Sequence, residues 1–409
     1  MNSDAFHFGR GDSRASLFRS PSSALLVLAL STAWILAGNA DAGQLVTQPF
    51  RGVTLIHRTE VFPRPVTMNV AIIDLQADGI RFKLTPPHGT RDTFPQTTLE
   101  YLNQENAQLA VNCHFYLPFP AAGADVNVVG FAASEGVLYS PFEPQPIAPG
   151  FLDQSYAILP RAPAMNIDPF NRVSILHPDP DSADGRAWLE PAALGNAFSG
   201  SAQIVTRGAI SIPQYGVGLG MLTPRNGYSE SLSWYDFVNA RTAVGVSRDG
   251  RALVLMTVDN VGGSWGMTVG EVAGVLVNDY DVVDALNLDG DGSTTFVMQD
   301  PDSLQGVFVN SPGEWPAGRS VGSNLAVFAL PILPPGPALF VSPAPPGCVW
   351  LSWSTPSEGW ELQSSPDLQG WHWASVGGQP KALGDHREIL LPTSGLSCFY
   401  RLAFVPPRH

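Results

Sequence analysis

The chain has 409 residues, of which 44% are hydrophobic and only 14% are charged, so it is long enough to form two domains with large buried cores. Its 36 acidic residues outnumber 22 lysines and arginines, and the net charge of −14 makes the chain a poor partner for nucleic acid or an anionic membrane. We therefore exclude nucleic acid as a partner. The 40 glycines and 37 prolines favour many short strands and turns over long helices.

The first 42 residues have the pattern of a secretory signal peptide. Three arginines precede an apolar run at residues 24–37, and Ala-Asp-Ala at 40–42 is typical of a cleavage site. A membrane anchor is the alternative, but the run is shorter than the roughly 20 residues that span a bilayer. We expect an exported protein, in the periplasm, at the cell surface or in the medium, with no stable membrane span after cleavage.

Residues 43–330 are predicted to form one large, strand-rich domain. Two helices are expected, at 97–106 and at 269–278, where Thr268 and Glu271 form a capping box. Residues 117–195 are rich in proline, alanine and acidic residues, which predicts long surface loops. Few helices among many strands indicate an α+β fold. The predicted strands cover residues 68–75, 79–84, 109–116, 241–247, 253–258, 282–288 and 325–330.

A proline-rich linker at 331–337 separates this domain from a C-terminal module at 338–409. The module has short alternating strands and several tryptophans, which predicts a small all-β sandwich. Its tryptophans either fill the sandwich core or bind sugar rings. Cys348 and Cys398 form either one disulfide or two free thiols, and Cys113 is left over.

The segment at 287–295, Asn-Leu-Asp-Gly-Asp-Gly-Ser-Thr-Thr, follows an apolar strand and precedes another. If the chain stays extended there, Asn287, Asp289 and Asp291 share one face, and Gly290 and Gly292 let the backbone approach a ligand closely. The alternative is a hairpin turn whose aspartates bond their own backbone. We interpret the segment as a candidate site.

Other polar residues lie next to predicted strands. Asn112 and His114 share one face of the strand at 110–116, although a lone histidine is often a hydrogen-bonded bystander. Arg241 precedes an apolar strand, where its planar fork suits a phosphate or carboxylate, or else pairs with Asp236. A similar pair, Arg319 and Asn324, precedes the last strand of the domain.

Taken together, these segments resemble the phosphodiester glycosidase family, whose hallmark is close to N-L-D-G-G-G-S-S/T. Asp291 replaces the middle glycine of that hallmark, and Cys113-His114 replace a glycine pair of an early strand. The C-terminal module is similar, more weakly, to Trp-rich sandwich domains of exported bacterial proteins. In chain order the resemblance rests on Asn112-Cys-His-Phe-Tyr116, Ala197-Phe-Ser-Gly200, Arg241-Thr-Ala-Val-Gly245, Val258-Asp259, Gly266-Met-Thr-Val-Gly-Glu-Val-Ala273 and the run from Asn287.

The resemblance implies hydrolysis of a sugar-1-phosphodiester, as in a glycan or exopolysaccharide, with no required cofactor. Phosphate is a good leaving group, so one aspartate with arginines can suffice. We expect Asp289 as nucleophile or base, Arg241 as phosphate clamp, and His114 or Asp291 as the second acid or base. The expected substrate-binding residues are Asn112, Asn287, Gly290, Gly292, Ser293, Thr294, Arg319 and Asn324.

Two other classes of function remain open. Asp289, Asp291 and Ser293 occupy positions 1, 3 and 5 of an EF-hand-like loop, with Asp300 at position 12, so a Ca²⁺ ion at Asp289 and Asp291 would make a calcium-stabilised structural module. Against this, position 6 is Thr294 rather than glycine. The third class is a non-catalytic glycan-binding protein that keeps the family fold.

Overall fold

The computed structural model describes residues 42–409, with gaps at 120–122, 148–152, 217–220, 224–232, 333–335, 367–372, 394–397 and 406–409. The predicted signal peptide thus lies, but for its last residue, outside the described residues. Within them strands dominate, and the α-helices are two, α1 (Thr98–Glu105) and α2 (Val269–Tyr280). Both helices predicted from the sequence are confirmed, as is the capping box of Thr268 and Glu271.

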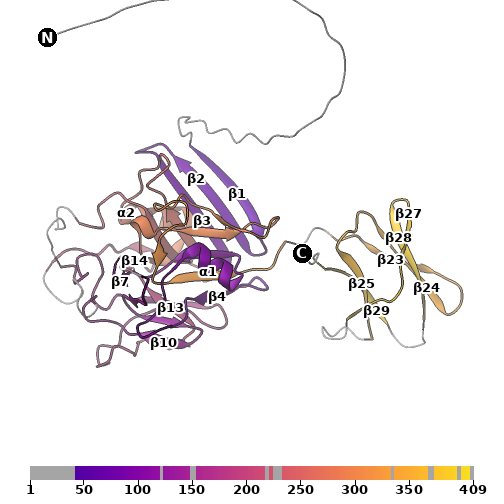
Figure 1. The fold of residues 1–409 in the computed structure, drawn as a ribbon, viewed down its shortest axis with the longest axis horizontal. Coiled ribbons are helices and arrows are strands. Elements are labelled where there is room, and N and C mark those ends of the chain that lie inside the picture. Colours follow the sequence, from indigo (N-terminus) through magenta and orange to yellow (C-terminus); the bar gives the residue numbers. More distant parts are fainter. Residues whose placement is uncertain are drawn as a thin grey trace, which may run out of the picture. The chain divides into compact units, whose positions relative to one another are not determined.

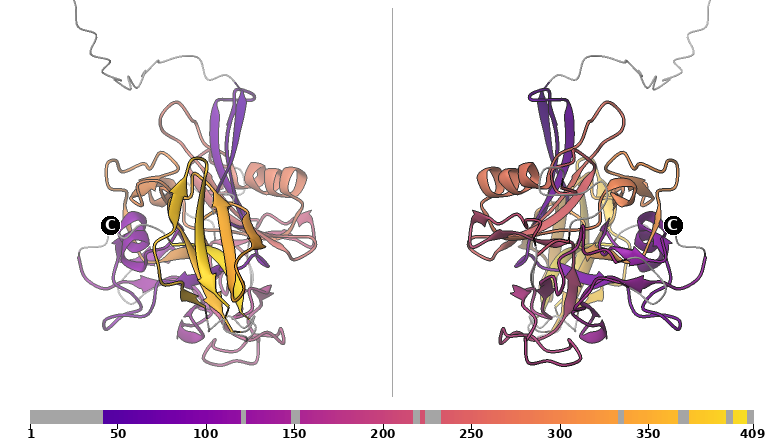
Figure 2. Two further views of the ribbon diagram at one scale, coloured as in Figure 1. Left: turned by 90° about the vertical axis from the view of Figure 1, so that its right-hand side faces the viewer. Right: turned by 90° about the vertical axis from the view of Figure 1, so that its left-hand side faces the viewer.

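The largest sheet has eight strands, and its first three, which run side by side in Figure 1, begin with a long antiparallel hairpin that is also visible in Figure 2. In spatial order the strands are β1 (Gly43–Phe50), β2 (Val53–Glu60), β3 (Val66–Asp74), β17 (Ala252–Val258), β16 (Arg241–Ser247), β18 (Val282–Asn287), β14 (Ala202–Thr206) and β15 (Ala209–Ile210).

Two five-stranded sheets complete the large region. One runs β20 (Gly306–Phe308), β19 (Phe296–Gln299), β6 (Leu109–Asn112), β22 (Asn324–Phe328) and β4 (Arg81–Leu84). The other runs β10 (Val137–Ser140), β9 (Ala132–Ser134), β13 (Asn196–Ser199), β11 (Ala164–Ile167) and β12 (Val173–Leu176). Two short pairs accompany them, β21 (Ser320–Val321) with β5 (Gln96–Thr97), and β7 (Tyr116–Leu117) with β8 (Asn127–Val128).

The prediction of long surface loops across residues 117–195 is wrong, because this segment supplies four of the five strands of the second sheet. These strands have only three or four residues each, and β11 is buried on both faces. A strand that is buried on both faces lacks the polar and apolar alternation by which a strand is recognised in a sequence. Described prolines such as Pro141, Pro163 and Pro178 lie just outside the bounds of these strands.

The central strands β16 and β17 of the eight-stranded sheet are buried on both sides, because alternate residues supply two cores. Leu253 and Leu255 of β17 face the core that this sheet shares with the five-stranded sheets. Val254 and Met256 of the same strand face α2. Successive side chains of a strand point to opposite faces, so this continuous apolar run covers both. The transfer of each such side chain from water into the core stabilises the folded state by about 1.5–3 kcal/mol.

The C-terminal residues form two further sheets, and Trp353 of one sheet and Leu362 of the other lie in the same hydrophobic cluster. The module boundary at 331–337 remains a prediction. Cys348, Cys398 and Cys113 are all unpaired, so the free-thiol alternative describes this structure. The sheets are β23 (Leu339–Pro343), β24 (Cys348–Ser354), β28 (His386–Pro392) and β27 (Lys381–Leu383), and β26 (Ala374–Ser375), β25 (Trp360–Ser365) and β29 (Phe399–Phe404).

Candidate functional site

The segment after β18 crosses from the eight-stranded sheet to the five-stranded sheet that contains β19. Backbone hydrogen bonds hold it from both sides: the N–H of Asp289 donates to the carbonyl of Cys113 at 2.9 Å, and that of Asp291 to Ala240 at 2.9 Å. A single 3-10 turn spans Asp291–Ser293. Asp291 has a φ of 54°, a left-handed conformation that aspartate tolerates better than most residues. A side chain therefore stands where the resembled family has a glycine.

Hydrogen bonds of the Asn112 side chain hold this loop in place. Its side-chain N–H donates to the carbonyl of Asp289 at 2.7 Å, and its Oδ1 accepts from the Thr242 hydroxyl at 2.8 Å and from the N–H of Thr295 at 3.0 Å. The residue is fully buried. Its predicted role in binding substrate is therefore corrected: Asn112 holds the loop in place, since both ends of its amide are engaged by the protein.

A cavity of about 380 Å³ opens above the loop. Five residues expected from the sequence line it: Asp289, Gly290, Asp291, Ser293 and Arg319. The remaining lining residues are Phe115, Tyr116, Leu117, Phe119, Val129, Gln154, Tyr156 and Trp234. A concave site that combines aromatic walls with a few convergent polar groups is the usual form of a small-molecule site.

Asp289 is the most perturbed acid of the cavity. Burial raises the pKa of its carboxyl to about 7, although the Ser293 hydroxyl and the Arg319 guanidinium oppose the shift. Only 8% of the residue is exposed. A carboxyl with a pKa near neutral can take up and release a proton at physiological pH, which suits general acid or base catalysis.

Arg319 is the cation of the cavity. Its Nη1 donates to the Ser293 hydroxyl at 3.3 Å, and its Nη2 lies 2.6 Å from the carboxylate of Glu314. The guanidinium also stacks on the ring of Phe119, 4.8 Å from its centre. A Cβ on Gly292 would lie 2.1 Å from Nη2, so the glycine provides the room that this arginine occupies.

Arg241 has a different role from the one predicted. Its Nε donates to the carbonyl of Met267 at 3.0 Å, and its Nη2 donates to the carbonyls of Trp234 and Phe237. The guanidinium lies 4.5 Å from the ring centre of Trp234, which lines the cavity in front of it. Arg241 is 1% exposed and is not among the described lining residues. The phosphate-clamp assignment is corrected because the protein backbone occupies this guanidinium.

His114 is also separated from the cavity. The residue is fully buried, its Nδ1 lies 2.6 Å from the Ser323 hydroxyl, and its Nε2 accepts from the N–H of Ser199 at 3.1 Å. Burial lowers the pKa of the imidazole to about 4, so the ring is neutral at physiological pH. His114 joins strands from different sheets, and the expectation of an acid or base at this position is corrected.

Three further candidates support the loop without lining the cavity. The side-chain amide of Asn287, the last residue of β18, donates to the Ser201 hydroxyl at 2.8 Å. Asn324 accepts from the Thr98 hydroxyl at 2.7 Å. Thr294 is 1% exposed, and its carbonyl accepts from Asn310 at 3.2 Å. The substrate-binding assignments of these residues are corrected on this geometry.

A metal site has little support from the geometry. No group of three or more His, Cys, Asp or Glu residues that could hold a metal ion is found in the part of the chain that the structure describes. Asp300, the closing position of the EF-hand-like pattern, accepts from the N–H groups of Asp302 and Ser303 in its own turn. Asp289 and Asp291 thus have no third carboxylate beside them among the described residues. Two carboxylates supply at most four of the six to eight oxygen ligands that Ca²⁺ takes.

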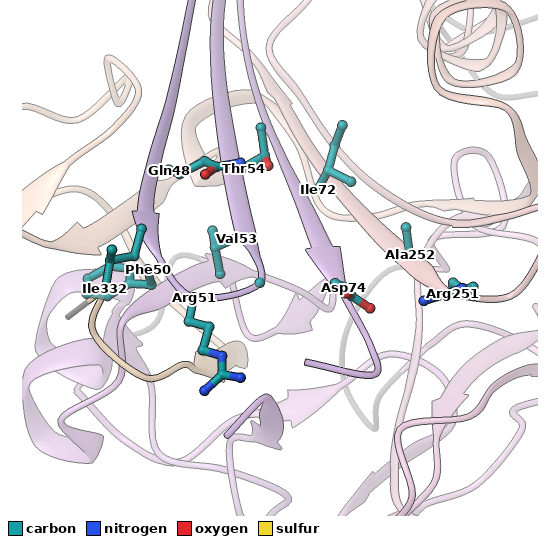
Figure 3. Close-up of a pocket in the computed structure, with 11 residues that line it drawn as sticks. Gln48, Phe50, Arg51, Val53, Thr54, Ile72, Asp74, Arg251, Ala252 and Ile332 are labelled. Carbon is teal, nitrogen blue, oxygen red and sulfur yellow. The ribbon is translucent and has the colours of Figure 1, made fainter. Parts of the chain in front are cut away.

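A second cavity, of about 440 Å³, lies at the opposite end of the eight-stranded sheet, where β3 ends and β17 begins (Figure 3). Its polar lining includes Arg51, Asp74 and Arg251. Arg51 is exposed and pairs with Asp78 at 3.0 Å. This cavity contains none of the candidate residues, and its charged groups do not include a buried acid.

Among the described residues, no helix is long and apolar enough to span a membrane.

The aromatic wall of the candidate cavity was missed by sequence reasoning. Phe119, Gln154, Tyr156 and Trp234 come from loops that are far apart in the chain and share no motif. The one available signal was indirect: Phe115 and Tyr116 continue the strand that carries Asn112. Their convergence depends on tertiary structure, as the edge-to-face contact of Phe115 with Trp234, with ring centres 5.8 Å apart, illustrates.

Residues 179–328 match the protein family described as phosphodiester glycosidase. The N-acetylglucosamine-1-phosphodiester alpha-N-acetylglucosaminidases of Bos taurus and Mus musculus are 38% and 36% identical to this chain over 115 residues. That stretch is 26% of this chain and spans about one fifth of each relative (20% and 21%).

Solved structures are also similar. One is the catalytic domain of the zebrafish N-acetylglucosamine-1-phosphodiester alpha-N-acetylglucosaminidase, auto-inhibited by its pro-peptide, with 17% identity and a TM-score of 0.47; the match covers 71% of this chain and 89% of that one. Another is a hypothetical protein from Synechocystis, with 15% identity and a TM-score of 0.47, covering 68% of this chain and 62% of that one.

Proposed function

We propose, from the match of residues 179–328 to the phosphodiester glycosidase family, that this chain is a hydrolase that cleaves the bond between the anomeric carbon of a sugar and a phosphodiester oxygen. The observation that carries the proposal is Asp289, a buried carboxyl with a pKa of about 7, in one cavity with Arg319. An acid poised near neutrality beside a fixed cation suits a reaction that moves one proton and releases an anion.

In the proposed reaction, ionised Asp289 accepts a proton from water as the water oxygen bonds to the anomeric carbon. The bond from that carbon to the phosphate oxygen breaks, and its electron pair leaves with the phosphate. Since phosphate is a good leaving group, little protonation of the departing oxygen is needed. Asp291 is exposed at the cavity and is placed to exchange the proton with solvent. Nucleophilic attack by Asp289 itself is the alternative first step.

Arg319 takes the role that the sequence assigned to Arg241. It borders the cavity and carries a charge that can interact with the phosphate. Its Nε and Nη2 both contact Glu314, so the Nη1 side, next to the Ser293 hydroxyl, is the side proposed to meet a phosphate oxygen. Glu314 and the Ser293 hydroxyl hold the guanidinium in place before substrate arrives. Such preorganised charge lowers the barrier because no solvent has to reorient during the reaction.

The sugar ring is proposed to lie against the aromatic wall. Tyr156 and Trp234 offer flat apolar faces, and Gln154 offers an amide for a hydroxyl group. This arrangement supports a carbohydrate substrate, which we propose to be a glycan or an exopolysaccharide met by the exported chain. Cys113 and His114, which depart from the family pattern, are both fully buried outside this lining, so that departure removes no group from the cavity.

The test is to incubate the purified chain from Gly43 with sugar-1-phosphodiesters and with p-nitrophenyl glycosides and to measure released sugar. We expect cleavage of at least one phosphodiester, no cleavage of the simple glycosides, and no turnover by Asp289→Asn. A well-folded chain that cleaves nothing but still binds polysaccharide would instead support the glycan-binding alternative. Parallel reactions with EDTA and with calcium, together with melting curves, test the calcium alternative.

A further inference from the structure

Five neighbouring strands of the eight-stranded sheet present their loops at the end of the sheet where the candidate cavity lies. β18 ends at Asn287, β16 begins at Arg241 and β17 ends at Val258. β3 begins beside the end of β17, and β2 ends beside the start of β3. The strands alternate in direction. The loops at 236–240, 259–267 and 61–65 therefore follow one another along the same end of the sheet, away from Asp289.

Each of these loops exposes an aromatic ring. Phe237 is 40% exposed, Trp265 is 65% exposed and Phe62 is 83% exposed. We call these three residues the aromatic row. Exposed valines at 238, 261 and 61 flank the rings. An exposed apolar patch of this extent marks an interaction or ligand surface in a soluble protein more often than it occurs by chance.

Polar contacts tie the three loops together, so the aromatic row belongs to one surface. The Asn260 amide donates to Asn239 Oδ1 at 2.6 Å, and the backbones of Asn239 and Met267 pair as an isolated bridge. The N–H of Trp265 donates to the carbonyl of Pro65 at 2.9 Å. Loops that are held by such contacts lose little conformational freedom when a ligand binds.

The aromatic row is continuous with the candidate cavity. Trp234 lines the cavity, and its carbonyl and that of Phe237 accept from the same nitrogen of Arg241. The N–H of Asp291, which lines the cavity, donates to the carbonyl of Ala240, the residue directly before β16. From Trp234 outward, the loops that carry Phe237, Trp265 and Phe62 follow in this order along the end of the sheet.

Chemistry distinguishes the possible occupants of this surface. Asn239 and Asn260, whose side chains bond to each other, lie in the chain between Phe237 and Trp265, so these two loops carry both aromatic and hydrogen-bonding residues. A carbohydrate chain has the matching combination, because sugar rings carry apolar C–H faces and polar hydroxyls. Strands lie about 4.8 Å apart, close to the length of one sugar unit in a chain.

We infer that the aromatic row is a binding platform for successive sugar residues of a polymeric substrate, extending the cavity on the side away from the bond that is cut. This inference rests on the proposed function, because it assigns a substrate class to the same site. The platform would make the chain prefer a sugar-1-phosphodiester within a polysaccharide over the same linkage in a small molecule.

The experiment compares two substrates, a phosphomannan that carries mannose-1-phosphodiesters and methyl α-mannose-1-phosphate, with the corresponding N-acetylglucosamine compounds as a second pair. Trp265→Ala and Phe62→Ala are expected to lower the ratio of kcat/KM for the polymer to that for the methyl ester by about threefold to tenfold, through KM. Phe170→Ala is the matched control. That phenylalanine is 76% exposed but lies between β11 and β12, in another sheet.

An unchanged ratio in both variants, with the wild-type chain active on the methyl ester, would overturn the platform and leave the proposed function intact. A loss confined to an octyl ester of mannose-1-phosphate would overturn it too, because the row would then bind an apolar chain. Melting curves confirm that the variants are folded, and both side chains are exposed enough that truncation opens no cavity.

Electrophoresis through gels containing phosphomannan keeps the inference testable if the wild-type chain hydrolyses none of these substrates. The proposed function would then have failed, whereas the platform would be supported if the gel retards the wild-type and Phe170→Ala chains more than Trp265→Ala and Phe62→Ala. Equal migration of all four chains would overturn the platform. Asp289→Asn serves as the wild-type background in these gels if the polymer is degraded.

Discussion

The side-chain amide of Asn112 donates to the main-chain carbonyl of Asp289 at 2.7 Å, joining β6 of one sheet to the loop that follows β18 of another. The same amide accepts from Thr242 and Thr295. The position of the candidate catalytic carboxyl is therefore determined by a residue 177 positions away that never contacts the cavity.

Asn112→Ala should destabilise the fold and reduce activity together. The substitution leaves the Thr295 N–H and the Asp289 carbonyl buried without their partner, at about 1–3 kcal/mol for each group. Urea unfolding should show a total loss of roughly 2–5 kcal/mol. Asn103→Ala, at an exposed position of α1, is the control and should change stability by less than about 0.5 kcal/mol. Equal stability of the two variants would contradict the assigned role.

The activity of the chain should rise with pH through about 7. Asp289 accepts a proton only when it is ionised, and burial raises its pKa to about 7. We expect kcat/KM to increase about tenfold per pH unit below that value and to level off above it. A profile with its acidic limb near pH 4, the ordinary range of a carboxyl, would show that another group acts as base.

Asp289→Asn should stabilise the fold at alkaline pH. The folded-state pKa lies above the unfolded value of 3.8, so the folded state holds the extra proton between the two pKa values and the wild-type stability falls as pH rises through about 7. A neutral asparagine avoids the free-energy cost of burying a charged carboxylate at this position. Melting at pH 8.5 should show a gain of about 1–3 kcal/mol that disappears at pH 3. A variant that is less stable at pH 8.5 would contradict the buried-acid assignment.

The two arginines should respond differently to the same substitution. Arg319→Gln should weaken binding of methyl phosphate by about tenfold or more with little loss of stability, because Arg319 borders the cavity. Arg241→Gln should lower the unfolding free energy by several kcal/mol, because its guanidinium serves buried carbonyls. Calorimetry with methyl phosphate and urea unfolding separate the two effects. The reverse pattern would restore the clamp to Arg241.

Gly292→Ala should impair substrate binding without unfolding the chain. Its Cβ would lie 2.1 Å from Arg319 Nη2, and the far end of that flexible side chain can move away. KM should therefore rise about as much as in Arg319→Gln, roughly tenfold. Gly270→Ala on α2 is the control, since its nearest neighbour is 3.9 Å away and alanine favours a helix by up to about 1 kcal/mol. An unaffected KM in Gly292→Ala would show that the position of Arg319 is unimportant.

Elements whose signals are local could be predicted from the sequence. The helix at Val269–Tyr280 begins at Thr268 because the reciprocal bonds of its capping box involve residues three positions apart. The Asp-Gly-Asp-Gly run likewise predicted a polar candidate site at a strand end, and Asp289 and Asp291 do line a cavity, although the chain turns at Asp291 where an extended segment was considered. Both features depend on neighbours in the chain, which a sequence displays directly.

Residues with equal local signals differ in role because of their packing in three dimensions. Arg241 and Arg319 each precede a strand, yet one is enclosed by the carbonyls of Trp234, Phe237 and Met267, while the other borders the cavity. His114 is neutral because its full burial lowers the pKa of the imidazole to about 4. The direction in which such a side chain points is set by packing between segments that are distant in the chain, and no pattern along the sequence records that packing.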